Sequence, residues 1–405
     1  MKILQIAPQV PVPLNEGGRI GIYNIAKYLA LRGHHIDFAC YRKNYKNDES
    51  YPLLEEFTTP YLLDVDIPNT AIGAIRNLFS SIPYNVWKFR TPEMENFLHE
   101  YLTEEKPDVI HIDHLHMAWM YDVIRKYSDA PVILREHNVE MQIMKRFYEK
   151  QKNPLLKLYS WLQYRKFITY EPETCAQFEG VAAITAEDEA ILLGMNKNIR
   201  TSVIPFGVDG TLLNSPLSDS VAPYSMFHIG SIRWLPNGDA LSWFLQEILP
   251  LVLEKQPEAR LFIYGAHSDK AEIPANVAHA VSAIGYVDDL WEAIKDKRIG
   301  VVPLRIGGGM RVKIVELMAA GKLIVSTSVG KEGIPLMDGV TGLVGDSPQE
   351  FAQKILDVFN GVVDEGAIIQ NARDLIAEKY TCEKMAAAFE ELYLKALAGR
   401  NSAKQ

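Results

Sequence analysis

Three glycines and three charged residues stand together in the stretch Gly307-Gly308-Gly309-Met310-Arg311-Val312-Lys313-Ile314-Val315-Glu316. An apolar run at 299–304 precedes it and predicts a buried parallel strand. An apolar-periodic run at 310–320 predicts a helix that stops at Gly321. Consecutive glycines let a ligand approach the backbone closely, and a helix N-terminus offers unpaired N–H groups with a partial positive charge. The stretch therefore predicts an anion site at a strand–loop–helix junction.

Lys313 and Glu316 are three residues apart, which places them on one face of the predicted helix. A cation followed by a carboxylate suits a phosphate and then a ribose diol, so the pattern predicts a nucleotide ligand. The alternative is a flexible loop with a solvated helix face. Two other nucleotide motifs are excluded, because no GxGxxG follows the first strand of either predicted domain and Gly321-Lys322 leads into Leu323 instead of Ser or Thr.

Length and charge narrow the class of protein. A chain of 405 residues should form about two domains, and its net charge of −9 argues against a nucleic-acid partner. It contains no apolar run of the roughly 20 residues that would span a bilayer, and we read no signal peptide at its N-terminus. Three scattered cysteines predict a reduced, cytoplasmic setting.

Short apolar strands alternate with amphipathic helices in both halves, which predicts an α/β protein of two doubly wound, Rossmann-like domains. We assign 1–205 to an N-terminal domain and 222–380 to a C-terminal domain, with 381–405 as a last helix. Ligands of such sheets bind at the carboxyl ends of the strands, so the site is expected between the two domains. The predicted strands are 3–7, 36–41, 109–112, 132–134, 181–184, 203–204, 227–229, 261–264, 299–304 and 323–326.

Polar groups follow several N-terminal strands. His111 lies inside a strand and is expected to be a core residue, whereas His114 and His116 lie past its end, where function concentrates in this architecture. The segment 135–138 ends the next strand and should face the same site. The histidine spacing does not match a zinc signature, so no metal is predicted. Gly17-Gly18, before the first helix, predicts either a ligand contact or a tight turn.

Two further segments carry charged residues in a pattern that could have a function. Asp64-Val65-Asp66 matches a metal-binding DxD over only three residues and is interpreted as solvated surface. Residues 141–170 carry seven Lys or Arg against one acid, with aromatic residues interleaved. This patch predicts either contact with an anionic membrane surface or an ordinary helical hairpin with aromatics in the core.

Taken together, these motifs resemble the retaining glycosyltransferases of family four (glycosyl transferases group 1), which have the GT-B fold. The likeness spans nearly the whole chain and is strongest from 227 to 344. Its motifs are Phe227-His228-Ile229-Gly230-Ser231, Trp234-Leu235-Pro236-Asn237, Gly285-Tyr286-Val287-Asp288, Val302-Pro303-Leu304, 307–321, 326–333, and, in the first half, Gly17-Gly18, Arg32-Gly33-His34, His137-Asn138-Val139-Glu140 and Pro205-Phe206-Gly207-Val208-Asp209.

The resemblance implies an enzyme that moves a sugar from a UDP- or GDP-sugar to an acceptor with retention and without a metal or other cofactor. It implies that Lys313 holds the diphosphate, that Glu316 binds the ribose and that Tyr286 and Val287 meet the base. It also implies that the last helix crosses back to the N-terminal domain. The wider donor contacts assigned in this way are Gly17, Gly18, Gly230, Ser231, Arg233, Gly307, Gly308, Gly309, Met310 and Arg311.

The chain departs from the family pattern at two positions. Gly308 stands where the family often has a second glutamate, and Ser231 stands where it has an arginine. We assign Arg311 and Arg233 as replacements for the lost contacts. Both departures bear on how the donor sugar and the diphosphate are held.

The resemblance therefore implies a metal-independent hexosyltransferase acting on a glycan or lipid-linked acceptor in polysaccharide or glycoconjugate biosynthesis. It would be cytoplasmic and peripheral to the membrane if 141–170 binds lipid. His114 is the first candidate and His116 the second for orienting or activating the acceptor. Lys313 and Glu316 complete the set of expected catalytic residues. A sugar-nucleotide epimerase of the same fold and a non-catalytic sugar-nucleotide-binding protein are the alternatives.

Overall fold

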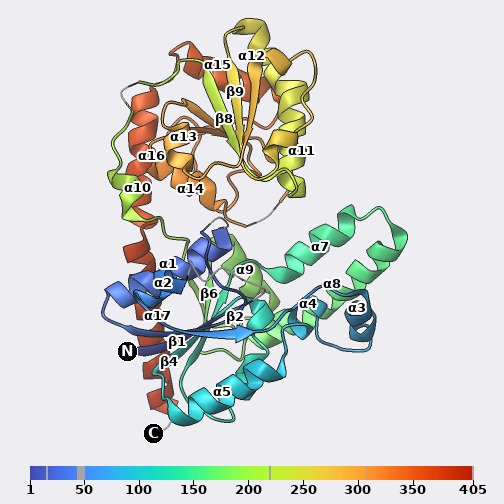
Figure 1. Cartoon of the computed structure of the whole chain (residues 1–405), viewed down its shortest axis with the longest axis vertical. Coiled ribbons are helices and arrows are strands. Elements are labelled where there is room, and N and C mark those ends of the chain that lie inside the picture. The colour runs from blue at the N-terminus through green and yellow to red at the C-terminus, as the bar shows by residue number, and fades with distance from the viewer. Residues whose placement is uncertain (15–16, 43–50, 219, 308, 404–405) are drawn as a thin grey trace. The chain divides into compact units, whose positions relative to one another are not determined.

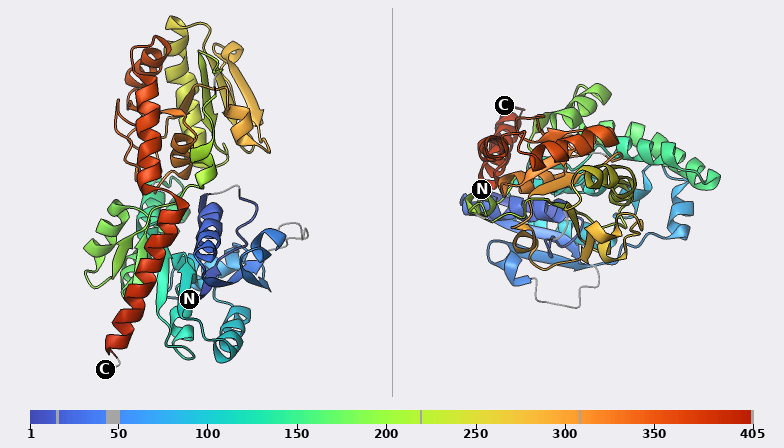
Figure 2. Two further views of the ribbon diagram at one scale, coloured as in Figure 1. Left: turned by 90° about the vertical axis from the view of Figure 1, so that its left-hand side faces the viewer. Right: turned by 90° about the horizontal axis from the view of Figure 1, so that it is seen from above.

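A computed structural model describes residues 1–14, 17–42, 51–218, 220–307 and 309–403. The chain divides into two compact units (Figure 1). Unit 1 consists of Met1–Gly207 together with Cys382–Gln405, and unit 2 is Val208–Thr381. In each unit helices cover a parallel sheet, as Figure 2 shows from two further sides.

All strand pairs described in the sheet of unit 1 are parallel, in the order β3-β2-β1-β4-β5-β6-β7. β1 lies between β2 and β4, with Ile3 opposite both Ile36 and Val109. The chain leaves β1 first toward β2 and later toward β4, so the strand order reverses beside β1. The strands are β1 (Lys2–Ala7), β2 (His35–Arg42), β3 (Thr59–Asp64), β4 (Val109–Asp113), β5 (Val132–Glu136), β6 (Gly180–Ala183) and β7 (Thr201–Val203).

The helices of unit 1 connect these strands, and the last of them returns from the C-terminal end of the chain. They are α1 (Gly17–Leu31), α2 (Tyr51–Glu55), α3 (Ala71–Asn77), α4 (Tyr84–Trp87), α5 (Pro92–Glu104), the short 3-10 turn η2 (Leu115–Met117), α6 (Met120–Ile124), α7 (Glu140–Lys150), α8 (Pro154–Cys175), α9 (Ala186–Met195) and α17 (Cys382–Ala403).

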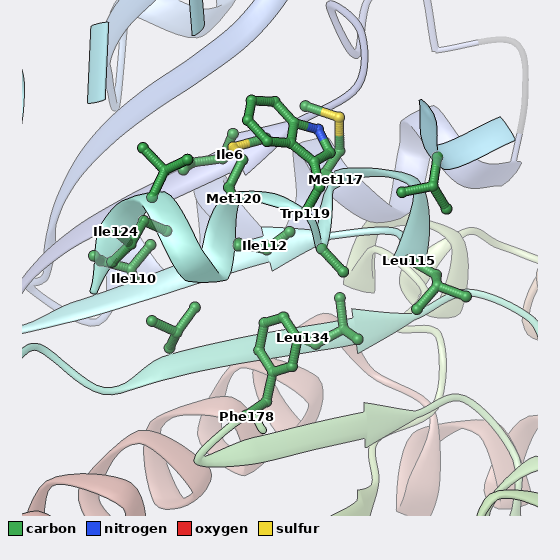
Figure 3. Close-up of a cluster of buried hydrophobic side chains, with 14 of the residues drawn as sticks. Ile6, Ile110, Ile112, Leu115, Met117, Trp119, Met120, Ile124, Leu134 and Phe178 are labelled. Atoms are coloured by element: carbon green, nitrogen blue, oxygen red, sulfur yellow. The ribbon is translucent and has the colours of Figure 1, made fainter. Parts of the chain in front are cut away.

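One face of the unit 1 sheet is covered by the segment that follows β4. Figure 3 shows Met117, Trp119 and Met120 from this segment packed above Ile112 of β4 and Leu134 of β5. Each of these side chains is at most 7% exposed. The β-branched and aliphatic residues of the strands supply the floor of the core, as expected for a parallel sheet covered on both faces.

The other face is covered by α1 and α17. Phe389 and Tyr393 of α17 are fully buried against a cluster that includes Ile133 and Ala182 of the sheet. The Tyr393 hydroxyl lies 2.5 Å from Nδ1 of His111 on β4. The C-terminal helix is therefore part of the core of unit 1.

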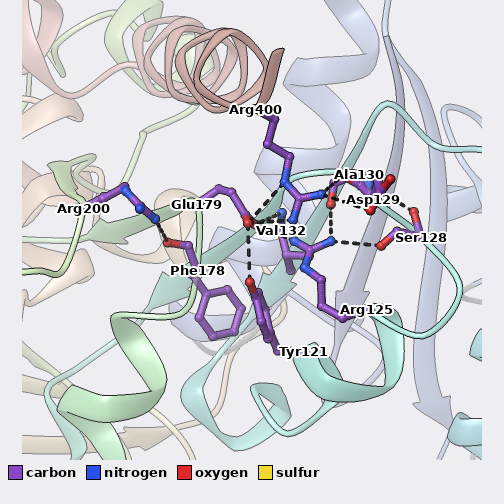
Figure 4. Close-up of polar contacts among 10 residues, drawn as sticks. All are labelled: Tyr121, Arg125, Ser128, Asp129, Ala130, Val132, Phe178, Glu179, Arg200 and Arg400. Carbon is purple, nitrogen blue, oxygen red and sulfur yellow. Dashed lines mark hydrogen bonds and ion pairs between the residues drawn. The ribbon is translucent and has the colours of Figure 1, made fainter. Parts of the chain in front are cut away.

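A polar cluster fixes the far end of α17. Figure 4 shows the Glu179 carboxylate between Arg400 of α17 and Arg125, with Arg400 Nη2 at 2.8 Å and Arg125 Nη2 at 2.6 Å. The backbone N–H of Val132 also donates to Glu179, at 2.8 Å. A half-buried carboxylate between two guanidinium groups in this geometry stabilises the position of the helix more than an exposed pair would.

The described sheet of unit 2 is also parallel, in the order β10-β9-β8-β11-β12-β13. Its strands are β8 (Ser225–Ile229), β9 (Arg260–Tyr264), β10 (Val281–Gly285), β11 (Ile299–Val302), β12 (Leu323–Ser326) and β13 (Leu343–Val344). Its helical segments are α10 (Gly210–Asn214), α11 (Leu235–Trp243), the π-helical η3 (Phe244–Ile248), α12 (Leu249–Lys255), η4 (Ser268–Lys270), η5 (Ala278–Ala280), α13 (Leu290–Ile294), α14 (Val312–Ala319), α15 (Pro348–Phe359) and α16 (Glu365–Lys379).

The prediction of two doubly wound α/β domains is confirmed. The helical segment from α11 to α12 is π-helical at η3, because Pro250 cannot donate a backbone hydrogen bond to the preceding turn. The edge strands β3, β10 and β13 were not predicted. Asp64 of the DxD segment ends β3 and pairs with Arg42 at the surface.

Truncation of Phe389 tests the place of α17 in unit 1. We expect Phe389→Ala to lower the free energy of unfolding by about 3–5 kcal/mol, because a fully buried aromatic side chain is lost from a packed core. Leu394→Ala, on the same helix but 54% exposed, is the matched control and should cost far less. Urea unfolding of the full chain measures both, and equal shifts would contradict this placement of α17.

Candidate functional site

The glycine-rich stretch forms the loop between β11 and α14. Gly307 has φ +134° and Gly309 has φ +76°, and both values lie in the region that favours glycine. Because Gly309 is left-handed, the helix begins only at Val312, and the prediction that Met310 and Arg311 are helical is wrong. Gly308 lies outside the described residues.

Lys313 and Glu316 lie on consecutive turns of α14, near its N-terminus. Lys313 is exposed and Glu316 is partly buried. Burial raises the pKa of Glu316, and the charge of Lys313 opposes that shift. Within the described ranges, neither side chain has a hydrogen bond or ion pair to another residue, so both are available to a ligand.

Arg311 connects this loop to the loop that follows β8. Its guanidinium carbon lies 5.7 Å from the centre of the Trp234 ring, and its Nη1 donates to the Gly309 carbonyl at 3.1 Å. A Cβ on Gly307 would meet Arg311 Nη2 at 2.3 Å, so only glycine fits there while the arginine keeps this position. The structure thus brings the loop after β11 against the loop after β8, although the two are far apart in sequence.

Glycines also stand at the carboxyl ends of β8 and β9. A Cβ on Gly265, which has φ +122°, would meet the Gly230 carbonyl oxygen at 2.6 Å. The Gly230 N–H donates to Tyr264 at 2.9 Å, and the Gly265 N–H donates to Gly285 at 2.8 Å. The three strand ends therefore meet backbone to backbone.

The other predicted donor contacts lie on loops that also follow the carboxyl ends of strands. Ser231 is partly buried and its carbonyl accepts from Asn237 Nδ2 at 3.2 Å, whereas Arg233 is exposed. Tyr286, directly after β10, is 64% exposed, and Val287 is partly buried. The structure thus places these residues close to strand ends.

Thr327, within the 326–333 motif, joins two loops of this site, a role that the sequence analysis did not assign to it. Its hydroxyl donates to the Leu304 carbonyl after β11 and accepts from the Gly330 N–H at 2.9 Å. The loops after β11 and β12 are joined in this way. The signals for it in the sequence are the position of Thr327 directly after an apolar strand and its place in the 326–333 motif.

In unit 1, a polar network lies at the carboxyl ends of β4 and β5. The Asp113 carboxylate accepts from Gln5 Nε2 at 2.8 Å and lies 3.2 Å from His137 Nε2 and 3.5 Å from His111 Nε2. Burial would raise the pKa of Asp113, but the two imidazoles outweigh it and hold that pKa well below its usual value. His111 is a core residue, as expected, and Asp113 and His137 meet as predicted for neighbouring strand ends.

His114 stands at the centre of a stack of rings. Its ring centre lies 3.6 Å from that of His137 and 5.8 Å from that of His116, which in turn stacks on Phe89. Its φ of +71° is unusual for a residue other than glycine, and its N–H donates to Arg135 at 3.0 Å. Burial, followed by the neighbouring His137 and His116, holds the pKa of His114 well below its usual value. His114 is therefore neutral at physiological pH, and a neutral imidazole can accept a hydrogen bond.

Beneath this network lie buried charges that the sequence did not reveal. Arg135 is 1% exposed, and a Cβ on Gly21 of α1 would lie only 3.3 Å from its guanidinium nitrogens. The Glu171 carboxylate accepts from the first N–H groups of α7, those of Glu140 and Met141, at 2.7 Å each. Burial, with the charge of Glu171, raises the pKa of Glu136 well above its usual value.

Gly17 and Gly18 begin α1. A Cβ on Gly18 would find no atom within 4 Å, so packing within the chain does not require glycine there. That leaves the ligand contact as a prediction.

Among the residues that the structure describes, no group of three or more His, Cys, Asp and Glu side chains is placed to hold a metal ion. In the same ranges, no helix has both the length and the apolar character needed to cross a membrane. The three cysteines, Cys40, Cys175 and Cys382, are buried.

Comparisons with known proteins agree with this geometry. A model of the Glycosyltransferase Family 4 group matches residues 16–211, and a model of the Glycosyl transferases group 1 family matches residues 223–360. The two matches follow one another along the chain, one mainly on unit 1 and the other within unit 2.

Individual relatives extend over almost the whole chain. An uncharacterized 44.6 kDa protein in the cps region of Klebsiella pneumoniae is 23% identical over 95% of this chain and 97% of its own. TarM has a TM-score of 0.70 at 13% identity, covering 97% of this chain and 98% of its own. Anabaena HepE, solved with UDP and glucose, has a TM-score of 0.65 at 15% identity, covering 96% and 98%. The chain thus belongs to the glycosyltransferases of group 1, family 4, and has the GT-B fold.

Proposed function

We propose that this protein is a retaining glycosyltransferase that moves a sugar from a UDP- or GDP-sugar to a glycan or lipid-linked acceptor. The observation that carries the proposal is the pair Lys313 and Glu316 on the first turns of α14, beside a loop with two left-handed glycines. A cation there suits a diphosphate, and a partly buried carboxylate one turn on suits the ribose hydroxyls.

The relatives support this assignment. HepE has been solved with UDP and with UDP-glucose, and TarM of S. aureus with UDP. A nucleotide-diphosphate sugar is therefore the donor class that we propose for this chain. The relative from a cps region supports a place in polysaccharide or glycoconjugate biosynthesis.

The reaction breaks the bond between the anomeric carbon and the donor diphosphate and forms one to an acceptor oxygen. Lys313 and the N–H groups at the start of α14 would neutralise the charge that develops on the leaving diphosphate. Attack from the same face as the leaving group gives retention without a protein nucleophile. In that route His114 orients the acceptor hydroxyl or takes its proton, and NMR of the product anomer tests the stereochemistry.

Replacement of Lys313 tests the diphosphate contact. We expect Lys313→Ala to weaken donor binding about 10- to 150-fold, because a charge-assisted hydrogen bond to phosphate contributes about 1.5–3 kcal/mol. Calorimetry, preceded by a thermal-shift screen of UDP-, GDP- and ADP-sugars, measures the change. Lys255→Ala is the control. Lys255 ends α12, which leads into β9, so it lies near the amino ends of the strands, away from the loop that begins α14. Unchanged affinity in Lys313→Ala would refute the proposed role.

The raised pKa of Glu316 predicts a pH dependence of nucleotide binding. Ribose hydroxyls donate to the carboxylate, so binding should weaken as the pH falls through this raised pKa, and at a higher pH than an ordinary glutamate would require. Glu316→Gln should bind more weakly and lose this acid limb. Titration of the affinity against pH in both proteins measures the effect, and an identical limb in the variant would rule it out.

His114 should act on transfer and leave nucleotide binding unchanged. We expect His114→Ala to lower kcat about 10²- to 10⁴-fold, the usual range for a general base, with donor affinity unchanged. Its depressed pKa also predicts that His114 itself causes no loss of activity between pH 6 and 7. His99→Ala, an exposed histidine on α5, is the control. Weaker donor binding without a change in kcat would contradict this role.

A further inference from the structure

Two separate segments of unit 1 are basic within an acidic protein. Residues 67–92 contain three Lys or Arg and no acid, and residues 150–170 contain five Lys or Arg and no acid, although the chain carries a net charge of −9. The first segment includes α3 and α4, and the second includes α8 as far as Tyr170, before Glu171 and Glu173 near its end. Only the second belongs to the patch that the sequence had indicated.

α3 exposes large apolar side chains along one side. Ile72 is 66% exposed, Ile75 is 61% exposed and Phe79, just past the helix end, is 92% exposed. The spacings of three and four residues place them on one face of a helical segment. A cluster of this kind is unusual on a surface that meets only water.

The helical hairpin of α7 and α8 has the same character. On α8, Leu158, Trp161 and Ile168 are 55%, 39% and 40% exposed and follow helical spacing, with the exposed Arg165 between them. On α7, Phe147 is 51% exposed. The expectation that the aromatics of this hairpin lie in the core therefore fails for Phe147 and Trp161.

The tip of the hairpin continues this surface. Leu155 and Leu156 are 78% and 51% exposed and lie between Lys152 and Lys157, which are also exposed. The first turn of α8 thus offers apolar and cationic groups side by side.

Buried hydrogen bonds hold α3 against α8. The Asn77 Oδ1 at the end of α3 accepts from Gln163 Nε2 at 3.0 Å and from Lys166 Nζ at 2.9 Å. Gln163 Oε1 in turn accepts from the Tyr84 N–H of α4 at 2.8 Å. Asn77 is fully buried and Gln163 is 2% exposed, so these bonds are shielded from water. Figures 1 and 2 show α3, α7 and α8 extending together beyond the sheet of unit 1.

We propose that α3 and the α7–α8 hairpin form one docking surface for an anionic lipid bilayer. The apolar side chains would enter the headgroup boundary while the lysines and arginines contact lipid phosphates. The composition argues against a protein partner, because lysine is depleted at protein interfaces. The net charge of −9 argues against a nucleic acid as the partner. This role goes beyond sugar transfer and does not depend on it.

Co-sedimentation of the full chain with vesicles tests the proposal. We expect binding to phosphatidylcholine vesicles that contain about one third phosphatidylglycerol, much weaker binding to phosphatidylcholine alone, and loss of binding in about 0.5 M salt. Equal binding to both vesicle types, or no binding at low salt, would overturn it. Brominated lipid should quench fluorescence in the wild type, and Trp161→Phe should lose part of that quenching.

Paired variants separate the two contributions. Ile75→Ser with Phe79→Ser should lower vesicle binding at least tenfold, and Lys150→Gln with Lys152→Gln and Lys157→Gln about 100-fold. The matched controls are Leu31→Ser with Val362→Ser, at sites 69% and 71% exposed elsewhere, and Lys255→Gln with Lys395→Gln. Wild-type binding by the α3 variant would overturn the role of α3, since α3 carries the apolar contact that the sequence did not indicate.

Nucleotide affinity and circular dichroism should stay unchanged in all four variants, because none of these positions lies at a strand end of unit 2. Absence of nucleotide-sugar binding by the wild-type chain, with vesicle binding intact, would count against the proposed function alone. A loss of vesicle binding with donor binding intact supports the docking surface.

Discussion

Parallel pairing of the strands is the constraint on which both sites depend. When all strands of a sheet run in the same direction, the loops that follow them gather at the carboxyl ends of the strands, however far apart these loops lie in sequence. In unit 2 this brings the Trp234 loop against Arg311, which is more than seventy residues later. In unit 1 it brings Asp113 against His137. If either strand were antiparallel, the loop that follows it would lie at the amino ends of the other strands instead.

The two sites treat charge in different ways. Unit 2 keeps Lys313 exposed at a helix start, where an anionic ligand can complete the pairing. In unit 1, burial lowers the pKa of His137 to about 4, whereas the imidazoles of His111 and His137 keep Asp113 ionised. A neutral, stacked His114 suits a hydrogen bond to an acceptor hydroxyl, whereas an exposed lysine suits binding of a diphosphate.

The C-terminal helix ties the end of the chain to the polar network of unit 1. Tyr393 of α17 contacts His111, which lies beside Asp113, and Phe389 packs within 5.8 Å of the Arg135 guanidinium. The geometry around His114 therefore depends on a helix that begins almost 270 residues later in the chain. Hydrogen bonds between α3 and α8 extend the same unit in another direction, as a basic and apolar surface.

The sequence by itself determined the alternation of strands and helices, the two-domain class and the Lys313–Glu316 pair, because hydrophobic periodicity and helical spacing are local properties. It also placed His111 in a strand and His114 beyond it. Local pattern could not show the left-handed Gly309 that delays α14, nor the edge strands β3, β10 and β13, which are short or only partly buried. The contacts of Arg311 with Trp234, of Tyr393 with His111 and of Asn77 with Gln163 join residues that are far apart in sequence. Only the tertiary structure decided these, because they arise when packing brings separate elements together.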